Sequence, residues 1–274
     1  MSKRSLLLPL AALCAAPVVL AHGAGPDGAN SASAPTYANL AASGSAQWSR
    51  VVSVAQPLRT DSPLFPGDPA FTSDPWATVA TDGYLLEQVS LGTHTGTHMS
   101  APCHFIDGAL CVDDLPAKMF VRKAVVIDVR NRVAVAGGDF QVTKQDLRDW
   151  ERQNGRIPEG AMVLLETGFS ANFFNDHYFD DAPGFSGEAV AWLMRSVGSG
   201  GRGAAGTGSD TFGPDATSDL AFDASYETYL AGGVTLENLA HLERLPAQGA
   251  TIIFLPALLK DGSGFQTNVI GLVP

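Results

Sequence analysis

Short aliphatic runs, most of them bounded by turn-forming residues, set the strongest limit on what this chain can fold into. They are rich in β-branched and aliphatic side chains, and this pattern predicts β-strands. The runs cover residues 48–54, 84–90, 123–129, 162–166, 251–255 and 267–272. A further strand is expected near Ala205, after a glycine-rich turn that begins at Gly198.

Three segments between these strands predict helices. Residues 143–154 begin with a capping threonine, and residues 186–197 form a second candidate. Residues 235–242 would form a third helix, with Leu236 and Leu239 on one apolar side. Because the predicted strands outnumber the helices, we expect an α+β fold in which helices flank mixed β-sheets.

The first residues have the pattern of an export signal. Lys3 and Arg4 form a basic start, residues 6–20 are apolar, and Ala21 ends a small-residue spacing that signal peptidases accept. The apolar run of about 15 residues is short of the roughly 20 that an uncleaved membrane anchor needs. We therefore expect residues 1–21 to be a cleaved signal peptide and the mature protein to be exported, to a periplasm or to the extracellular space.

A linker and one folded domain are expected after the signal. Residues 22–46 are rich in Ala, Gly, Ser, Asn and Pro and show no apolar period, which predicts a flexible linker. The chain is 45% hydrophobic and 16% charged, so residues 47–274 can bury a substantial core.

The charge balance limits the classes of partner. The net charge is −11, and it becomes −13 once Lys3 and Arg4 leave with the signal peptide. An acidic surface repels nucleic acid and anionic membranes, because binding to either depends on clustered Lys and Arg. We therefore expect neither partner for the mature protein.

Three of the six histidines lie together in the stretch His94-Thr-Gly-Thr-His98-Met-Ser100-Ala-Pro-Cys-His104. The surrounding Thr, Gly and Pro residues disfavour a helix, so we expect a strand that runs into a loop. Neutral imidazoles that converge on one point can bind a divalent cation. Two alternatives stay open: the rings are ordinary structural histidines, or they act as acid–base groups without a metal.

Two cysteines remain after the predicted cleavage. Cys103 lies inside the histidine stretch, and Cys111 follows it. An oxidising compartment would allow the two thiols to form a disulfide. Two buried free thiols, or a metal-bound Cys103, are the other interpretations.

The histidine stretch resembles the His-x-Gly-Thr-His-x-Asp-x-Pro-x-His signature of the cyclase family, which includes bacterial kynurenine formamidases and isatin hydrolases. Two later segments are also similar to family motifs. Gly208-Ser-Asp210-Thr resembles a Gly-x-Asp-Thr segment, and Gly233-Val-Thr-Leu-Glu237-Asn-Leu resembles a Gly-[Val/Ile]-x-x-x-Glu-Asn-Leu segment. The resemblance extends from about Trp48 to the C-terminus.

This resemblance implies a fold and a chemistry. The fold is a swivelling β/β/α-like domain, usually dimeric, and the activity is the hydrolysis of an amide or lactam with zinc or manganese. By motif match, His94 and His98 are metal ligands, and His104 is a ligand or a proton shuttle. Glu237 matches a carboxylate at the site, as a metal ligand or proton carrier.

Two positions depart from the family pattern. Ser100 stands where the signature has Asp, and Tyr226 stands where a histidine is expected before Glu237. A hydroxyl is a weaker ligand than a carboxylate, so one metal ion is expected where relatives hold two. Ser100 can also orient water or hydrogen-bond a ligand from outside the metal shell.

The expected function is hydrolysis of an amide, lactam or related carbonyl C–N or C–O bond in a small molecule by metal-activated water. Aromatic residues between Phe169 and Phe179 would line a pocket for an aromatic substrate, or they pack in a core or loop. An exported, non-catalytic protein that binds a small molecule or a metal is the alternative. A serine hydrolase is disfavoured, because the sequence has no Gly-x-Ser-x-Gly segment.

Overall fold

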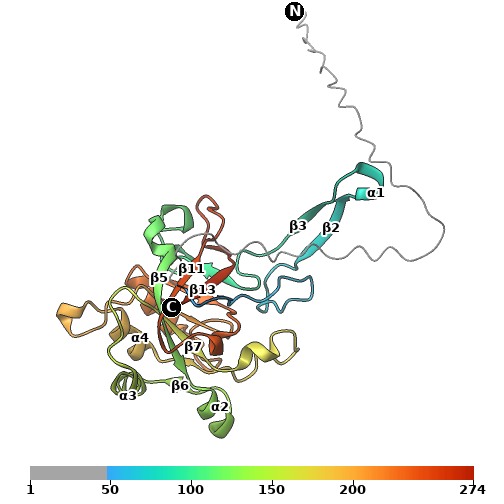
Figure 1. Ribbon diagram of the computed structural model, residues 1–274. Helices are drawn as coiled ribbons and strands as arrows, with labels where there is room; N and C mark the ends of the chain where they lie inside the picture. Colours follow the sequence, from blue (N-terminus) through green and yellow to red (C-terminus); the bar gives the residue numbers. More distant parts are fainter. Residues whose placement is uncertain (1–47) are drawn as a thin grey trace, which may run out of the picture. The chain divides into compact units, whose positions relative to one another are not determined.

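A nine-stranded sheet organises the part of the chain that the structure, a computed structural model, describes, residues 48–274 (Figure 1). The predicted signal peptide at residues 1–21 and the predicted linker at residues 22–46 lie outside the described residues. Within the described part, no helix is both long enough and apolar enough to cross a membrane.

The sheet is mixed, with parallel strands at its centre. Its strands, in spatial order, are β1 (Arg50–Ser53), β13 (Val269–Val273), β11 (Gln248–Phe254), β5 (Val121–Asp128), β7 (Met162–Glu166), β9 (Gly206–Ser209), β10 (Val234–Glu237), β4 (His98–Ser100) and β12 (Gly264–Gln266). The central neighbours β5, β7, β9 and β10 pair in parallel. The remaining pairs on both sides are antiparallel.

The central strands are buried on both faces, and their side chains alternate between two cores. On β7, Met162 and Leu164 belong to one hydrophobic cluster, whereas Val163 and Leu165 belong to the other. This alternation follows from the two-residue period of a strand, and it explains why residues 162–166 form a continuous apolar run.

The two hydrophobic cores lie on opposite faces of the sheet and are built from different elements. One contains Val52 of β1, Phe254 of β11, Met99 of β4 and Leu236 of β10, so strands far apart in the sheet order share it. The other contains residues of the helices that cover the opposite face. The helices of the fold are α1 (Val79–Asp82), α2 (Arg130–Ala136), α3 (Lys144–Asn154), α4 (Gly187–Met194) and α5 (Asp223–Leu230).

Most of the predicted elements are confirmed. Each of the six predicted aliphatic runs overlaps a strand, and β9 lies where a strand was expected after the glycine-rich turn. α3 begins after Thr143, which forms a capping box with Asp146, and α4 begins after Ser186. The α+β class is confirmed.

The predicted helix over residues 235–242 is wrong. The segment forms β10, which is followed by Asn238 and His241 in left-handed conformations with φ of 55° and 54°. Leu236 and Leu239 are fully buried, as expected for an apolar side, but from a strand and a loop. Pairing of β10 with β9 and β4 decided this conformation, because leucine spacing alone does not separate a short strand from a helix.

Two small sheets stand apart from the main one. β6 (Gln141–Val142) pairs in parallel with β8 (Gly184–Phe185), and β2 (Thr72–Ala77) pairs antiparallel with β3 (Leu86–Ser90). The β2–β3 arm projects from the sheet, with α1 at its tip (Figure 1). Its large apolar side chains are exposed.

Candidate active site

Three antiparallel strands bring the predicted site residues together. β4 lies between β10 and β12, and the register sets His98 opposite both Glu237 of β10 and Gln266 of β12. Residues directly opposite in neighbouring strands present side chains that contact each other. The pairing of β4 with β10 therefore joins the histidine stretch to Glu237.

The histidines lie on a turn, a strand and a 3₁₀ turn rather than on one continuous strand. His94 belongs to the turn before β4, His98 begins β4, and His104 ends a 3₁₀ turn that starts at Pro102. The rings still meet: the centroids of His94 and His98 are 5.0 Å apart, and His94 stacks on His104 at 3.9 Å.

Hydroxyl groups hold one oxygen of the Glu237 carboxylate. Oε1 accepts hydrogen bonds from Ser100 Oγ at 3.0 Å and from Thr235 Oγ1 at 2.6 Å. The Tyr229 hydroxyl lies 2.8 Å from Thr235 Oγ1 and is buried. Because Oε1 is occupied by these donors, Oε2 is the oxygen left for the histidines.

His98 presents an unused nitrogen to that oxygen. Its Nδ1–H donates to the carbonyl of Gly96 at 2.8 Å, because a carbonyl oxygen can only accept. In the neutral ring, Nε2 therefore carries a lone pair; it is buried, makes no hydrogen bond, and lies 3.3 Å from Glu237 Oε2. Two electron-rich atoms this close in a buried site require a proton or a cation between them.

The electrostatics of this pair agree with that requirement. Burial disfavours a charged imidazole, but the Glu237 carboxylate outweighs burial and raises the pKa of His98 above its usual value. Burial likewise acts against the Glu237 charge, but His98 and the hydroxyl donors hold the pKa of Glu237 well below its usual range. Glu237 is therefore a carboxylate at neutral pH, which suits a ligand better than a proton donor.

His94 is held by two serines. The Ser100 hydroxyl donates its proton to Glu237, so Ser100 Oγ accepts a hydrogen bond from His94 Nδ1–H at 3.1 Å. The other ring nitrogen, His94 Nε2, accepts from Ser263 Oγ at 2.9 Å. Burial, followed by the charges of His98 and His104, lowers the pKa of His94 to about 3. The ring is therefore neutral at physiological pH.

His104 is the accessible histidine of the three. Its side chain is exposed, and burial lowers its pKa even though Glu237 opposes the shift. It lies at the edge of a group of aromatic rings, with Phe105 4.6 Å away between centroids. The ring centroid of Tyr226 lies 6.2 Å from that of Phe105. Tyr229 lies deeper, and its hydroxyl hydrogen-bonds Thr235, which in turn contacts Glu237.

The donor set fits a divalent cation in its chemistry. Among residues 48–274, no group of three or more His, Cys, Asp or Glu side chains is already arranged to hold a metal ion. His98 Nε2, which makes no hydrogen bond, nevertheless lies 3.3 Å from Glu237 Oε2, and imidazole and carboxylate are ligands of zinc and manganese. A third protein ligand would have to come from His94 or His104 by rotation of a side chain.

Some contributors to the site were missed by sequence reasoning. Thr235 lies two residues before Glu237, a spacing that puts both on one face of a strand, but the segment was predicted as a helix. Ser263 is distant in the sequence and carries no local signal. Cys103 and Cys111 form a disulfide, which anchors the 3₁₀ turn of His104 and is one of the three interpretations of these cysteines.

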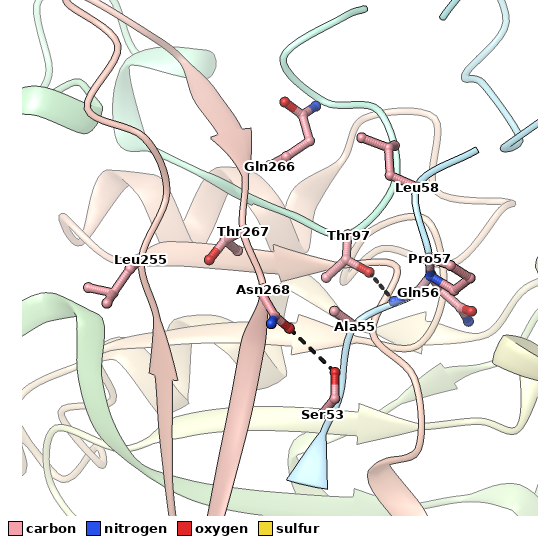
Figure 2. Close-up of a pocket in the computed structure, with 10 residues that line it drawn as sticks. All are labelled: Ser53, Ala55, Gln56, Pro57, Leu58, Thr97, Leu255, Gln266, Thr267 and Asn268. Atoms are coloured by element: carbon pink, nitrogen blue, oxygen red, sulfur yellow. Dashed lines mark hydrogen bonds between the residues drawn. The ribbon is translucent and has the colours of Figure 1, made fainter. Parts of the chain in front are cut away.

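A pocket of about 530 Å³ lies beside the histidine turn (Figure 2). Its wall includes Leu58, Thr97 and Gln266, and none of the three histidines or Glu237 lines it. Thr97 Oγ1 accepts from the backbone N–H of Gln56, and Gln266 Nε2 donates to the carbonyls of Gly92 and Thr95. These wall residues brace the turn that carries His94.

The aromatic residues predicted between Phe169 and Phe179 mostly pack among themselves. Phe173 and Tyr178 are buried, and their ring centroids are 5.1 Å apart. Phe179 contacts both Tyr178 and Phe212, and Phe212 stacks on Phe65 at 5.0 Å. The segment is therefore loop packing with one link to the rings near His104.

Comparisons with known proteins agree with this site. The Cyclase family profile, described as "Putative cyclase", matches residues 52–216. The isatin hydrolase of Roseibium aggregatum is 30% identical over an alignment of 199 residues that covers 67% of this chain and 73% of that protein. A kynurenine formamidase of Bacillus thuringiensis is 27% identical over an alignment of 225 residues that covers 80% of this chain and 95% of that protein.

A solved structure shows the same fold. Isatin hydrolase A from Labrenzia aggregata, bound to benzyl benzoate, superposes with a TM-score of 0.75 and 31% identity, over 82% of this chain and 93% of that one. The named relatives hydrolyse C–N bonds other than peptide bonds, and isatin is a lactam. With the family profile, the fold and the histidine and glutamate motifs in agreement, this chain belongs to the cyclase family of hydrolases.

Proposed function

We propose that this protein is a metal-dependent hydrolase that cleaves the amide or lactam C–N bond of a small aromatic molecule, or a related carbonyl bond. The observation that carries the proposal is the buried Nε2 of His98, which makes no hydrogen bond and lies 3.3 Å from the Glu237 carboxylate. An imidazole and a carboxylate in that arrangement share a proton that a divalent cation can replace, so they form part of a cation site.

The proposed ligands are His98, Glu237 and, as the third, His94, which leaves His104 to carry protons. One zinc or manganese ion is proposed, because Ser100 removes the carboxylate that the family signature has at that position. When bound, the ion would supply Lewis-acid polarisation of the substrate carbonyl and lower the pKa of a water molecule.

The protein's own groups perform the remaining steps. Ser100 and Thr235 fix Glu237 Oε1 and so hold the carboxylate in one orientation. His104 is neutral and exposed, so it can accept the proton of the attacking water and pass it to the leaving nitrogen. The proposed division of roles is Glu237 as ligand and His104 as proton shuttle.

Aromatic rings beside His104 support an aromatic substrate. Phe105, which follows His104, lies 5.8 Å from Phe222 and 6.2 Å from Tyr226, and Phe222 lies 6.4 Å from Phe65. Phe65, Phe222 and Tyr226 are partly exposed. Exposed rings beside a polar centre favour stacking of a planar substrate next to His104.

The test combines elemental analysis with activity. Protein purified without added metal is analysed for zinc and manganese and assayed with N-formyl aromatic amines and with lactams. Hydrolysis that a chelator abolishes and that zinc or manganese restores supports the proposal. Stoichiometric metal or ligand binding without turnover of any substrate contradicts it and supports a non-catalytic binding protein.

We also propose that the mature protein is exported, on the signal pattern of residues 1–21.

We further propose that the protein forms a homodimer through the β2–β3 arm. Trp76 and Leu85 on this arm are 69% and 61% exposed, and an isolated two-stranded hairpin is only marginally stable in water. Trp76→Glu should give monomers in size-exclusion chromatography with light scattering. Val135→Glu, at a position on α2 that is 90% exposed, is the control; a monomeric wild type contradicts the dimer.

A further inference from the structure

Asn238 uses every polar group it has, although it is only 2% exposed. Its backbone N–H donates to Thr211 O at 2.8 Å, and its carbonyl accepts from Thr97 Oγ1 at 2.6 Å. Its side-chain Oδ1 accepts from the Tyr178 hydroxyl at 2.9 Å, and Nδ2 donates to Gly96 O at 3.0 Å. Asn238 therefore links the end of β10 to the turn before β4.

The carbonyl of Gly96 receives two donors. One is Asn238 Nδ2, and the other is His98 Nδ1, at 2.8 Å. A carbonyl oxygen has two lone pairs, so both hydrogen bonds can form together. The shared acceptor places the amide of Asn238 and the imidazole of His98 around one fixed point.

We propose that Asn238 is a positioning residue for His98. It holds the Gly96 carbonyl in the place where that carbonyl fixes the proton of His98 on Nδ1. The Nε2 lone pair then points at Glu237 Oε2. Insofar as this concerns metal binding, it rests on the proposed function.

The chain favours asparagine here for two physical reasons. The residue has φ of 55°, a left-handed conformation in which Asn, Asp and Gly are tolerated better than other residues. The side chain must also donate to Gly96 and accept from Tyr178, and a carboxamide does both. Aspartate has the same shape and tolerates the backbone, but its carboxylate cannot donate.

The residue that supplies the shared carbonyl is itself restricted to glycine. Gly96 has φ of 69°, and a Cβ added there would lie 2.9 Å from Leu58 Cδ1. Asn238 also directly follows Glu237, and its own backbone is fixed by hydrogen bonds to Thr211 and Thr97, so one residue is tied both to the strand of the carboxylate and, through Gly96, to the imidazole.

Metal affinity tests the proposal. Zinc and manganese binding to chelator-stripped protein is measured by calorimetry for wild type, Asn238→Asp and Asn238→Gly, two changes that the left-handed backbone tolerates. Loss of an outer hydrogen bond to a ligand histidine is expected to weaken metal binding about 10-fold to 100-fold. Affinity within about threefold of wild type in both folded variants would overturn the proposal.

The control variant is Thr95→Val. Thr95 is buried in the same turn, but its hydroxyl makes no hydrogen bond. Valine has nearly the same shape, so this change removes the hydroxyl and leaves the hydrogen bonds to the Gly96 carbonyl in place. We expect metal affinity to stay within about threefold of wild type. An equal loss in this variant would mean that any disturbance of the turn weakens binding, which contradicts a specific role for Asn238.

A second readout needs no metal and separates this inference from the proposed function. Long-range ¹H–¹⁵N spectra of metal-free protein, at a pH where His98 is neutral, report which ring nitrogen carries the proton. Wild type should show the Nδ1–H tautomer, and Asn238→Gly should populate Nε2–H. If the wild type binds no metal but the tautomer changes as expected, the proposed metal site is wrong and the role of Asn238 stands. If the tautomer is the same in both proteins, the role of Asn238 is wrong.

Discussion

Glu237 and His98 stand directly opposite each other in the register of β10 and β4, and the carboxylate Oε2 lies 3.3 Å from the imidazole Nε2. Neither atom has another hydrogen bond partner in the described residues. The hydroxyls of Ser100 and Thr235 hold the other carboxylate oxygen, so the pair is oriented before any ligand arrives.

Removal of His98 and removal of His104 should have different effects. His98→Ala deletes a proposed ligand, so we expect loss of bound metal and of activity. His104→Gln deletes the proposed proton shuttle, so kcat should fall by about 10²-fold to 10⁴-fold while metal content is retained. Elemental analysis beside steady-state kinetics separates the two outcomes.

His177→Ala provides a control for this pair of variants. His177 is exposed and pairs with Asp180, and it makes no ring contact, hydrogen bond or ion pair with the three histidines of the site. The variant should keep both metal and kcat. Full metal content in purified His98→Ala would remove His98 from the ligand set.

Ser100→Asp restores the carboxylate of the family signature. In the metal-free protein, the new carboxylate would face Glu237 Oε1, which Ser100 now contacts at 3.0 Å, and we expect stability to fall by about 1–3 kcal/mol. Added zinc or manganese should reverse the loss and bind more tightly or in greater number. Calorimetry and thermal unfolding with and without metal measure this; identical affinity and stoichiometry would show that position 100 does not act on the metal.

A buried carboxylate outside the site should give a pH-dependent stability. Glu166 is buried at the end of β7, and burial together with Asp128 outweighs Arg130 and raises the pKa of Glu166 to about 7. The folded state then binds more protons than the unfolded state between about pH 4.5 and 7. The cost of a buried charge therefore grows as pH rises through this window.

Glu166→Gln removes this cost. Relative to wild type, the variant should gain about 1–2 kcal/mol between pH 5 and pH 8, after allowance for the Arg130 ion pair at 3.1 Å. Denaturant unfolding at the two pH values measures the difference. Glu188→Gln, at an exposed carboxylate on α4, is the control; a parallel shift of both variants would refute the assignment to Glu166.

The Cys103–Cys111 disulfide should stabilise the turn of His104. The two residues are 8 apart in sequence, and a loop this short is expected to contribute about 2–3 kcal/mol. Cys103→Ser combined with Cys111→Ser should lower Tm and should also reduce kcat, because the histidine loses its anchor. Tm scans and kinetics of wild type with and without reductant check this, and an unchanged Tm after verified reduction would contradict it.

Much of the fold was predictable because its signals are local. Residues 162–166 form a continuous apolar run because β7 is buried on both faces. Thr143 marks the start of α3 because its side chain caps the first turn of that helix. The histidine cluster was likewise visible, because its members lie within one short stretch and their spacing follows a recognisable motif.

What the sequence by itself determined was therefore the fold class, the family and the imidazole-rich stretch. Only the tertiary structure decided that residues 234–237 form a strand, that Ser263 donates a hydrogen bond to His94, and that the Asn238 side chain donates one to the Gly96 carbonyl. The physical reason is that these contacts depend on strand pairing between residues far apart in sequence. A single register shift in β4 or β10 would turn His98 or Glu237 to the opposite face.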